Sequence, residues 1–115
     1  MPTAVIHSPA VLSAGRDFAR RVALAWPLQV ALLFGSQARG SAHVGSDTDV
    51  AVLLHGAPGD FVATKLALDD VAYDVLLDSG IRIQPLPIWE DEWAHPERYS
   101  NTRLLENIAR EGLAL

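Results

Sequence analysis

Two short apolar runs, each bounded by residues that interrupt regular structure, place the strongest constraint on how this chain folds. The first run is LQVALLF, residues 28–34, between Pro27 and Gly35, and the second is TDVAVLLH, residues 48–55. Runs of this length without polar alternation are typical of strands that are covered on both faces. We therefore expect two buried strands in a sheet with helices packed on it.

The segments around these strands carry the signals of helices. A first helix begins at Ser8-Pro9, because serine is a favoured N-cap and proline suits the first helical position. It ends before Pro27, since the residue before a proline is driven out of the helical conformation. A longer helix is predicted over residues 60–78 and is stopped by Gly80.

A third strand is predicted over IRIQPLPIW, residues 81–89. Its two prolines, Pro85 and Pro87, are two positions apart and therefore lie on one side of the strand. Proline lacks an N–H group and is confined to edge strands or strand ends, so this segment predicts an edge strand or the frayed end of a strand. The run contains no aspartate or glutamate.

A final helix begins at Asn101 or Thr102 and is closed by Gly112. The predicted order of elements is αβ(α)βαβα, in which the bracketed short helix follows the first strand. This order describes a small α/β (α+β) domain with about three strands. The chain contains no repeat, low-complexity segment or linker, so we expect a single domain over residues 1–115.

Composition argues against several classes of function. The 115 residues carry 14 acidic and 9 basic side chains, and the net charge of −5 argues against a binder of nucleic acid or anionic membranes. The cluster of Arg16, Arg20 and Arg21 is interpreted as a solvated helix face. No cysteine is present, which excludes disulfides, cysteine-ligated zinc and iron–sulfur clusters. The N-terminus lacks a secretory signal pattern and no apolar run is long enough to span a bilayer, so a cytoplasmic protein is expected.

The segment over residues 33–53, LFGSQARGSAHVGSDTDVAVL, has the residue types of a phosphate site. A buried strand leads to Gly35 and Ser36, where the absence of a Cβ lets the backbone approach a ligand closely. Backbone N–H groups in such a turn bind phosphate oxygens, and the Ser36 hydroxyl can donate a further hydrogen bond. Arg39 follows within reach of the same anion.

Two carboxylates follow at the start of the second buried strand. Residues two apart in a strand point to the same face, so Asp47 and Asp49 are expected to project together near the phosphate turn. Adjacent carboxylates repel one another unless a cation lies between them, and Mg²⁺ commonly binds one or two carboxylates plus substrate phosphates. A phosphate turn beside such a pair indicates phosphoryl or nucleotidyl transfer.

These residues resemble the signature of the DNA polymerase beta-type nucleotidyltransferase superfamily, and the chain length is closest to its minimal nucleotidyltransferase (MNT) branch. The resemblance covers about twenty residues strongly and implies a small mixed sheet with helices packed on it. It also implies that Gly35 and Ser36 bind the triphosphate, with supporting contacts from Arg39 and Ser46.

The same resemblance implies that Asp47 and Asp49 bind Mg²⁺ or Mn²⁺ and are catalytic, and it exposes one departure. Members of the superfamily usually present a third carboxylate on the strand after the long helix, where it completes the metal site and deprotonates the acceptor. Here Gln84 is the best match to that position and Arg82 the second, and an amide cannot act as a general base. Glu90 reaches the site only if the end of that strand curls back. Another base, poor transfer or an inactive site all remain open.

The resemblance implies a Mg²⁺-dependent nucleotidyltransferase whose donor is a nucleoside triphosphate, with ATP favoured, and whose acceptor is a hydroxyl on a partner protein. MNT proteins often pair as antitoxins with helical HEPN-domain toxins, and some transfer AMP onto a tyrosine of the toxin. A chain of this size leaves the nucleotide half-site open, so a partner is expected to complete it. A homodimer is also compatible with the sequence.

Two alternatives stay open. In the first, the chain is a binding module that neutralises a HEPN partner by contact alone, which the missing third carboxylate favours. The intact Gly-Ser turn and Asp-x-Asp pair favour the enzyme instead. A small-molecule transferase of the aminoglycoside-modifying kind is the third possibility.

Overall fold

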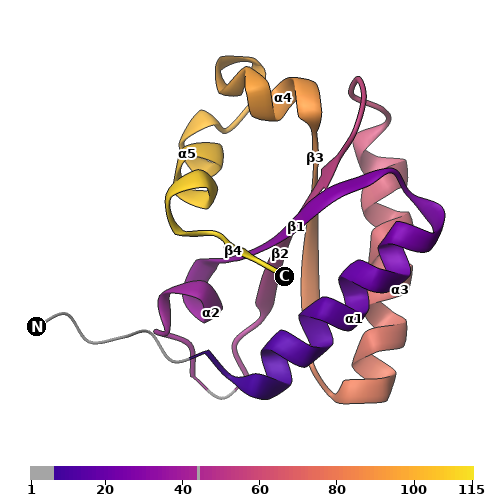
Figure 1. Ribbon diagram of the computed structural model, residues 1–115, viewed down its shortest axis with the longest axis vertical. Coiled ribbons are helices and arrows are strands. Elements are labelled where there is room, and N and C mark those ends of the chain that lie inside the picture. The colour runs from indigo at the N-terminus through magenta and orange to yellow at the C-terminus, as the bar shows by residue number, and fades with distance from the viewer. Residues whose placement is uncertain (1–6, 44) are drawn as a thin grey trace, which may run out of the picture.

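A computed structural model of the protein describes residues 7–43 and 45–115. The expectations that concern residues 1–6, among them the absence of a secretory signal, lie outside the described residues. A central sheet separates two helical layers: α1 and α3 lie on one side, and α5 with the short helix α4 lies on the other (Figure 1).

The predicted helices are confirmed, and so are the predicted N-caps at Ser8 and Asn101. In chain order the helices are α1 (Pro9–Ala25), α2 (Gly35–Arg39), α3 (Phe61–Ser79), α4 (Glu90–Ala94), the 3₁₀ turn η1 (Pro96–Arg98) and α5 (Thr102–Glu111). Side-chain oxygens of Ser8, Asp60 and Asn101 accept hydrogen bonds from backbone N–H groups in the first turns of α1, α3 and α5. Such caps stabilise a helix by about 1 kcal/mol each, which explains why local sequence located these helix starts.

The sheet has four strands rather than about three. The strands are β1 (Leu28–Phe34), β2 (Thr48–Leu54), β3 (Ile83–Trp89) and β4 (Leu113–Ala114), in the order β3-β2-β1-β4. β1 is antiparallel to β2 and β4, whereas β2 and β3 are parallel, so the sheet is mixed as expected. The added strand has only two residues, and it forms because the chain leaving α5 at Gly112 runs beside β1.

The buried strands separate two cores because their side chains alternate between faces. Val50, Val52 and Leu54 pack with α1 and α3, while Ala51 and Leu53 pack with α5. All five are at most 1% exposed. The expectation of a strand covered on both faces is therefore confirmed for β2. It is wrong for β1, in which only Ala31 and Leu33 are buried and Gln29 is exposed, because the short strand β4 and helix α5 cover its other face only in part.

β3 is an edge strand, as its prolines predicted. The carbonyl of Arg82 accepts a hydrogen bond from the backbone N–H of Thr48 in β2. In a parallel ladder, only every second residue directs its backbone N–H and C=O groups toward the neighbouring strand. The backbone N–H and C=O groups of the odd-numbered residues of β3 therefore point away from β2. Pro85 and Pro87 therefore lie where the free edge would otherwise offer N–H donors, which blunts this edge against pairing with another strand.

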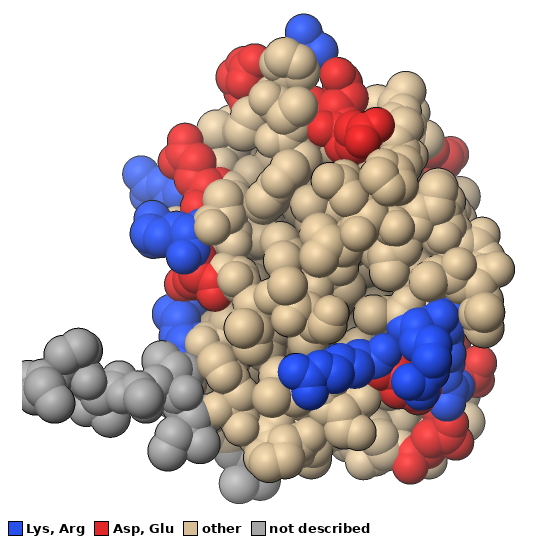
Figure 2. All heavy atoms as spheres, in the orientation of Figure 1, with Lys and Arg blue, Asp and Glu red and all other residues tan. Residues whose placement is uncertain are grey.

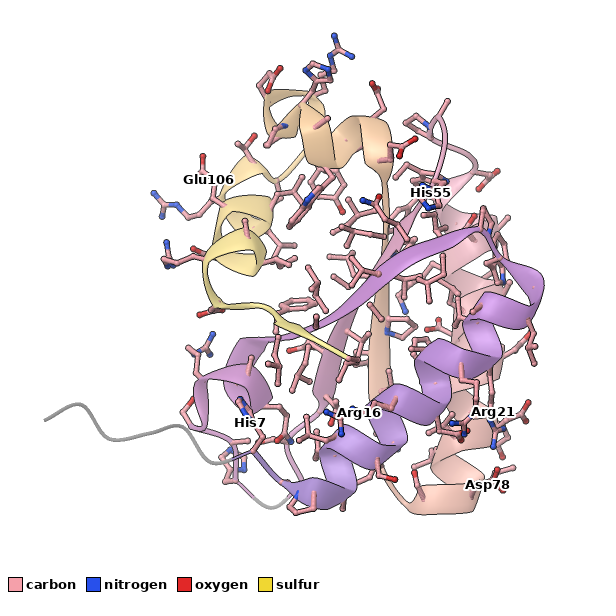
Figure 3. All side chains as sticks on the ribbon, in the orientation of Figure 1. His7, Arg16, Arg21, His55, Asp78 and Glu106 are labelled. Carbon is pink, nitrogen blue, oxygen red and sulfur yellow. The ribbon has the colours of Figure 1, made fainter. Side chains whose placement is uncertain are left out.

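The arginine cluster of α1 is a solvated, ion-paired face. Arg20 and Arg21 both pair with Asp17, and Arg21 also contacts Asp78 of α3 at 2.5 Å (Figure 3). Figure 2 shows the basic side chains over α1 lying among acidic ones, at the margin of a face that is otherwise largely uncharged. Among the described residues, no helix is long and apolar enough to cross a membrane.

Candidate active site

The turn between β1 and α2 forms the base of the candidate site. Gly35 follows directly on Phe34 and has a φ of +72°, a left-handed conformation that side chains other than glycine rarely adopt. Ser36 is the next residue, in the first turn of α2, and is half-buried. The sequence predicts the close approach of a ligand to this glycine, and the structure adds a backbone conformation that favours the same residue type.

Asp49 lies directly against this turn. In the antiparallel pairing of β1 with β2, Asp49 is opposite Phe34. A Cβ built on Gly35 would lie 2.5 Å from Oδ2 of Asp49 and 3.4 Å from its Cγ. The glycine is therefore required twice, by its φ and by the carboxylate that occupies the space a side chain would fill.

Asp47 is exposed and precedes β2 by one residue. Burial raises the pKa of Asp49 above its ordinary value, and the negative charge of Asp47 raises it further, while the positive charge of Arg39 acts in the opposite direction. The two aspartates therefore form a repelling pair. A bound cation relieves such a repulsion.

Gln84 occupies the place beside Asp49 in the neighbouring strand. The parallel register pairs Asp49 with Gln84, so their side chains share one face of the sheet. Arg82 lies two residues earlier, with its Nε 4.0 Å from Oδ1 of Asp47. Among the described residues, no group of three or more histidine, cysteine or acidic side chains is placed to hold a metal ion.

Glu90 does not approach the site. It follows Trp89, which pairs with Leu54 at the opposite end of β2 from Asp49. Its carboxylate accepts from the backbone N–H of Gly56 at 3.1 Å and contacts Nδ1 of His55 at 3.2 Å. The end of β3 therefore does not curl back to supply a third carboxylate.

The two supporting candidates, Arg39 and Ser46, both make contacts within the protein. Arg39 at the end of α2 pairs with Glu111 at the end of α5, at 3.0 Å. The Ser46 hydroxyl accepts from the backbone N–H of His43 at 3.0 Å, which closes the turn before Asp47. Glu111 was missed by sequence reasoning, because it is 72 positions from Arg39 and lies in an ordinary helix end.

A cleft of about 660 Å³ opens beside Asp47, between the start of α1, the segment before β2 and the segment after α3. Its polar lining includes Gln37, Ser46, Thr48 and Arg82. The hydroxyl of Thr48 is buried without a hydrogen-bond partner in the part of the chain that the structure describes. The cleft has the size of small-molecule sites.

One family model matches most of the chain and shows which family it belongs to. Residues 16–106, which include the whole turn, both aspartates and Gln84, match the family of nucleotidyltransferase domains. The chain belongs to this family. No curated protein matches the sequence.

Solved structures share the fold of this nucleotidyltransferase domain at low sequence identity. A toxin–antitoxin structure with AMP-PNP has 21% identity and a TM-score of 0.56, and the match covers 91% of this chain and 68% of that one. A mutant of the toxin–antitoxin MntA-HpeT has 22% identity and a TM-score of 0.56, with 96% and 72% covered. A candidate nucleotidyltransferase from Sulfolobus solfataricus has 17% identity and a TM-score of 0.53, with 96% and 90% covered. These likenesses confirm the predicted fold.

The donor groups of this nucleotidyltransferase domain fit one divalent cation. Asp47 and Asp49 supply carboxylate oxygens, and Gln84 supplies an amide oxygen next to Asp49. Magnesium typically takes one or two carboxylates and completes its shell with water and substrate phosphate. The repulsion between the aspartates and the glycine that makes room for Asp49 are both consistent with such a site.

Proposed function

We propose that this nucleotidyltransferase domain transfers a nucleoside monophosphate from a nucleoside triphosphate, with ATP favoured, to a hydroxyl group on a partner protein. The observation that carries the proposal is the contact between the Gly35 turn and the carboxylate of Asp49. It joins the two halves of a nucleotidyl-transfer site, the phosphate turn and the acidic pair, in one place.

The phosphate turn binds the donor. Backbone N–H groups after Gly35 and the hydroxyl of Ser36 donate to triphosphate oxygens, and Arg39 adds positive charge from the end of α2. The cleft beside Asp47 has the volume that a nucleoside needs. A triphosphate bound to this turn lies next to Asp49, whose carboxylate contacts the same turn.

Asp47 and Asp49 would hold Mg²⁺ or Mn²⁺, which when bound neutralises phosphate charge. In the reaction the acceptor oxygen forms a bond to the α-phosphorus, and pyrophosphate leaves with the electron pair of the broken phosphoanhydride. Gln84 has no basic atom, so the hydroxyl proton passes to solvent rather than to a third carboxylate. We therefore expect slow transfer, which depends on positioning of the two reactants.

The proposed biological role is that of an antitoxin whose partner is a helical HEPN-type toxin. Two of the solved structures with this fold are toxin–antitoxin assemblies, one of them with AMP-PNP. Their fold supports the role, and the exposed position of Asp47 and Gln84 leaves room for an acceptor from another chain.

A second candidate function is a binding module that neutralises the same partner by contact alone. The observation that favours it is the amide of Gln84 opposite Asp49, where a carboxylate would be expected for efficient transfer. Retention of both the glycine turn and the aspartate pair favours the enzyme, because neither is needed for contact.

Calorimetric titration of ATP, with and without Mg²⁺, tests the proposal. We expect Mg²⁺-dependent binding that is lost when Asp47→Asn and Asp49→Asn are combined. Asp91→Asn is the matched control, because it removes a carboxylate from α4 at the other end of the sheet. Incubation with the partner and ATP should then add one nucleotide mass to the partner. Full neutralisation of the toxin partner by a chain that transfers no nucleotide would contradict the proposal that the protein is an enzyme.

A further inference from the structure

The outer face of α3 carries an unpartnered apolar ridge. Val62, Leu66, Tyr73 and Leu77 are between 58% and 66% exposed, although each is a large apolar or aromatic side chain. Of the large hydrophobic side chains that are exposed in the described part of the chain, only Leu24 lies outside α3. The exposure is therefore concentrated on one helix.

Helical geometry places these four side chains in one line. Their spacing of four, seven and four residues repeats along a single face, opposite the face that packs on the sheet. The inner face is formed by Thr64, Leu68, Ala72 and Val75, which are all buried. A helix that is apolar on both faces is typical of one that is covered on both sides.

Acidic side chains border the ridge. α3 contains four aspartates and one lysine. Lys65 pairs with Asp69, and Arg21 of α1 pairs with Asp78. Asp70 and Asp74 are exposed and have no ion pair within the described residues. A molecule bound to the ridge is therefore held more tightly when it places positive charge along this acidic border.

A second copy of the chain fits this surface poorly. Two antiparallel α3 helices would match Val62 with Leu77 and Leu66 with the partner copy's Tyr73, since both pairs share one midpoint. The same symmetry brings Asp70 of each copy close to its counterpart at the two-fold axis. Like charges meeting there without a counter-ion oppose the pairing. The border likewise repels anionic membranes and nucleic acid.

We propose that the ridge of α3 is the docking surface for an amphipathic helix of a partner protein whose apolar side chains are flanked by lysine or arginine. Helix-on-helix recognition of this kind uses anchors at the spacing that the ridge presents. Apolar burial supplies the affinity, and the unpaired aspartates select a basic over an acidic partner.

A small pocket connects the ridge to the edge of the sheet at Gln84. This pocket of about 180 Å³ lies between α3 and β3 and is lined by Tyr73, Leu76, Arg82 and Gln84, among others. Gln84 is in register with Asp49. Asp49 shares the opposite face of the sheet with Ala51 and Leu53, so a partner docked along α3 reaches it around the β3 edge, past Gln84. This inference about the acceptor rests on the proposed function.

Peptide binding tests the surface directly. The probe is a synthetic amphipathic helix of 19 residues, the length of α3, with leucines along one face and lysine and arginine beside them. A second peptide carries glutamate at every basic position. We expect the basic peptide to bind at least tenfold more tightly in fluorescence anisotropy, and to shift backbone amide resonances of α3 in NMR spectra.

Surface variants locate the binding. Leu66→Ser with Tyr73→Ser should weaken the basic peptide at least tenfold, whereas Leu24→Ser, at an equally apolar residue of α1 that is 85% exposed, should leave the affinity unchanged. Asp70→Lys with Asp74→Lys should reverse the preference between the peptides. Equal affinities, resonance shifts confined to other elements, or a dimer that Leu66→Ser dissociates in sedimentation would each overturn the proposal. ATP titration of the wild-type chain reports on the proposed function separately, because it is carried out without either peptide.

Discussion

The carboxylate of Asp49 occupies the space in which residue 35 would carry a side chain, with Oδ2 only 2.5 Å from an ideal Cβ on Gly35. The two residues are brought together by the antiparallel pairing of β1 and β2. This contact makes the glycine a requirement of the site as well as of the turn.

The first prediction concerns Gly35→Ala. The φ of +72° costs a non-glycine residue about 1–2 kcal/mol, and the methyl group also displaces the Asp49 carboxylate. Gly80→Ala is the matched control, because its φ is +76° and a Cβ there meets nothing within 4 Å. We expect both variants to lower the thermal midpoint, Gly35→Ala by about 4 °C or more beyond the control. We expect Gly35→Ala also to lose ATP binding. Equal midpoints would show that the carboxylate is free to move away.

The second prediction concerns the charge of Asp49. Its pKa is raised in the folded state, so folding favours the protonated carboxyl, and that contribution to stability is lost as pH rises through the folded pKa. Asp49→Asn should therefore raise the thermal midpoint at pH 7, by about 2–4 °C, since the side chain is only partly buried. The gain should shrink as the pH falls toward the ordinary value of 3.8. A gain that persists unchanged at acid pH would assign the effect to packing instead of charge.

The third prediction concerns Gln84→Glu. A carboxylate in register with Asp49 adds a third negative charge to the pair, which should strengthen Mn²⁺ binding at least tenfold and lower stability without metal. Gln29→Glu makes the same change at an exposed position of β1 and should alter neither property. Calorimetric titration of Mn²⁺ measures the effect. If the affinity for Mn²⁺ is unchanged, Gln84 does not occupy the position of the third carboxylate of the metal site.

The fourth prediction concerns Glu111→Gln. The variant releases Arg39 from an exposed ion pair, so stability should change by less than about 1 kcal/mol. The freed guanidinium should tighten ATP binding about two- to fivefold at low salt, with a smaller gain at high salt. Glu106→Gln, an outward-facing residue of α5, controls for net charge (Figure 3). Weaker ATP binding in Glu111→Gln would mean that the pair positions Arg39 productively.

Local sequence was sufficient for the elements themselves. The caps at Ser8, Asp60 and Asn101 act within one helical turn, so neighbouring residues are enough to predict where these helices begin. The edge character of β3 also followed locally, from Pro85 and Pro87. Two-residue β4 was not predicted, because a strand this short forms only where an existing strand offers a free edge.

The sequence by itself determined the helices and the two central strands, since each depends on periodicity or spacing along a few residues. Only the tertiary structure placed Asp49 against Gly35, brought Gln84 into register with Asp49 and left the outer ridge of α3 without a partner. These relationships join residues 14 to 35 positions apart or require the position of every other layer. They are set by how strands pair and helices pack, which no local pattern records.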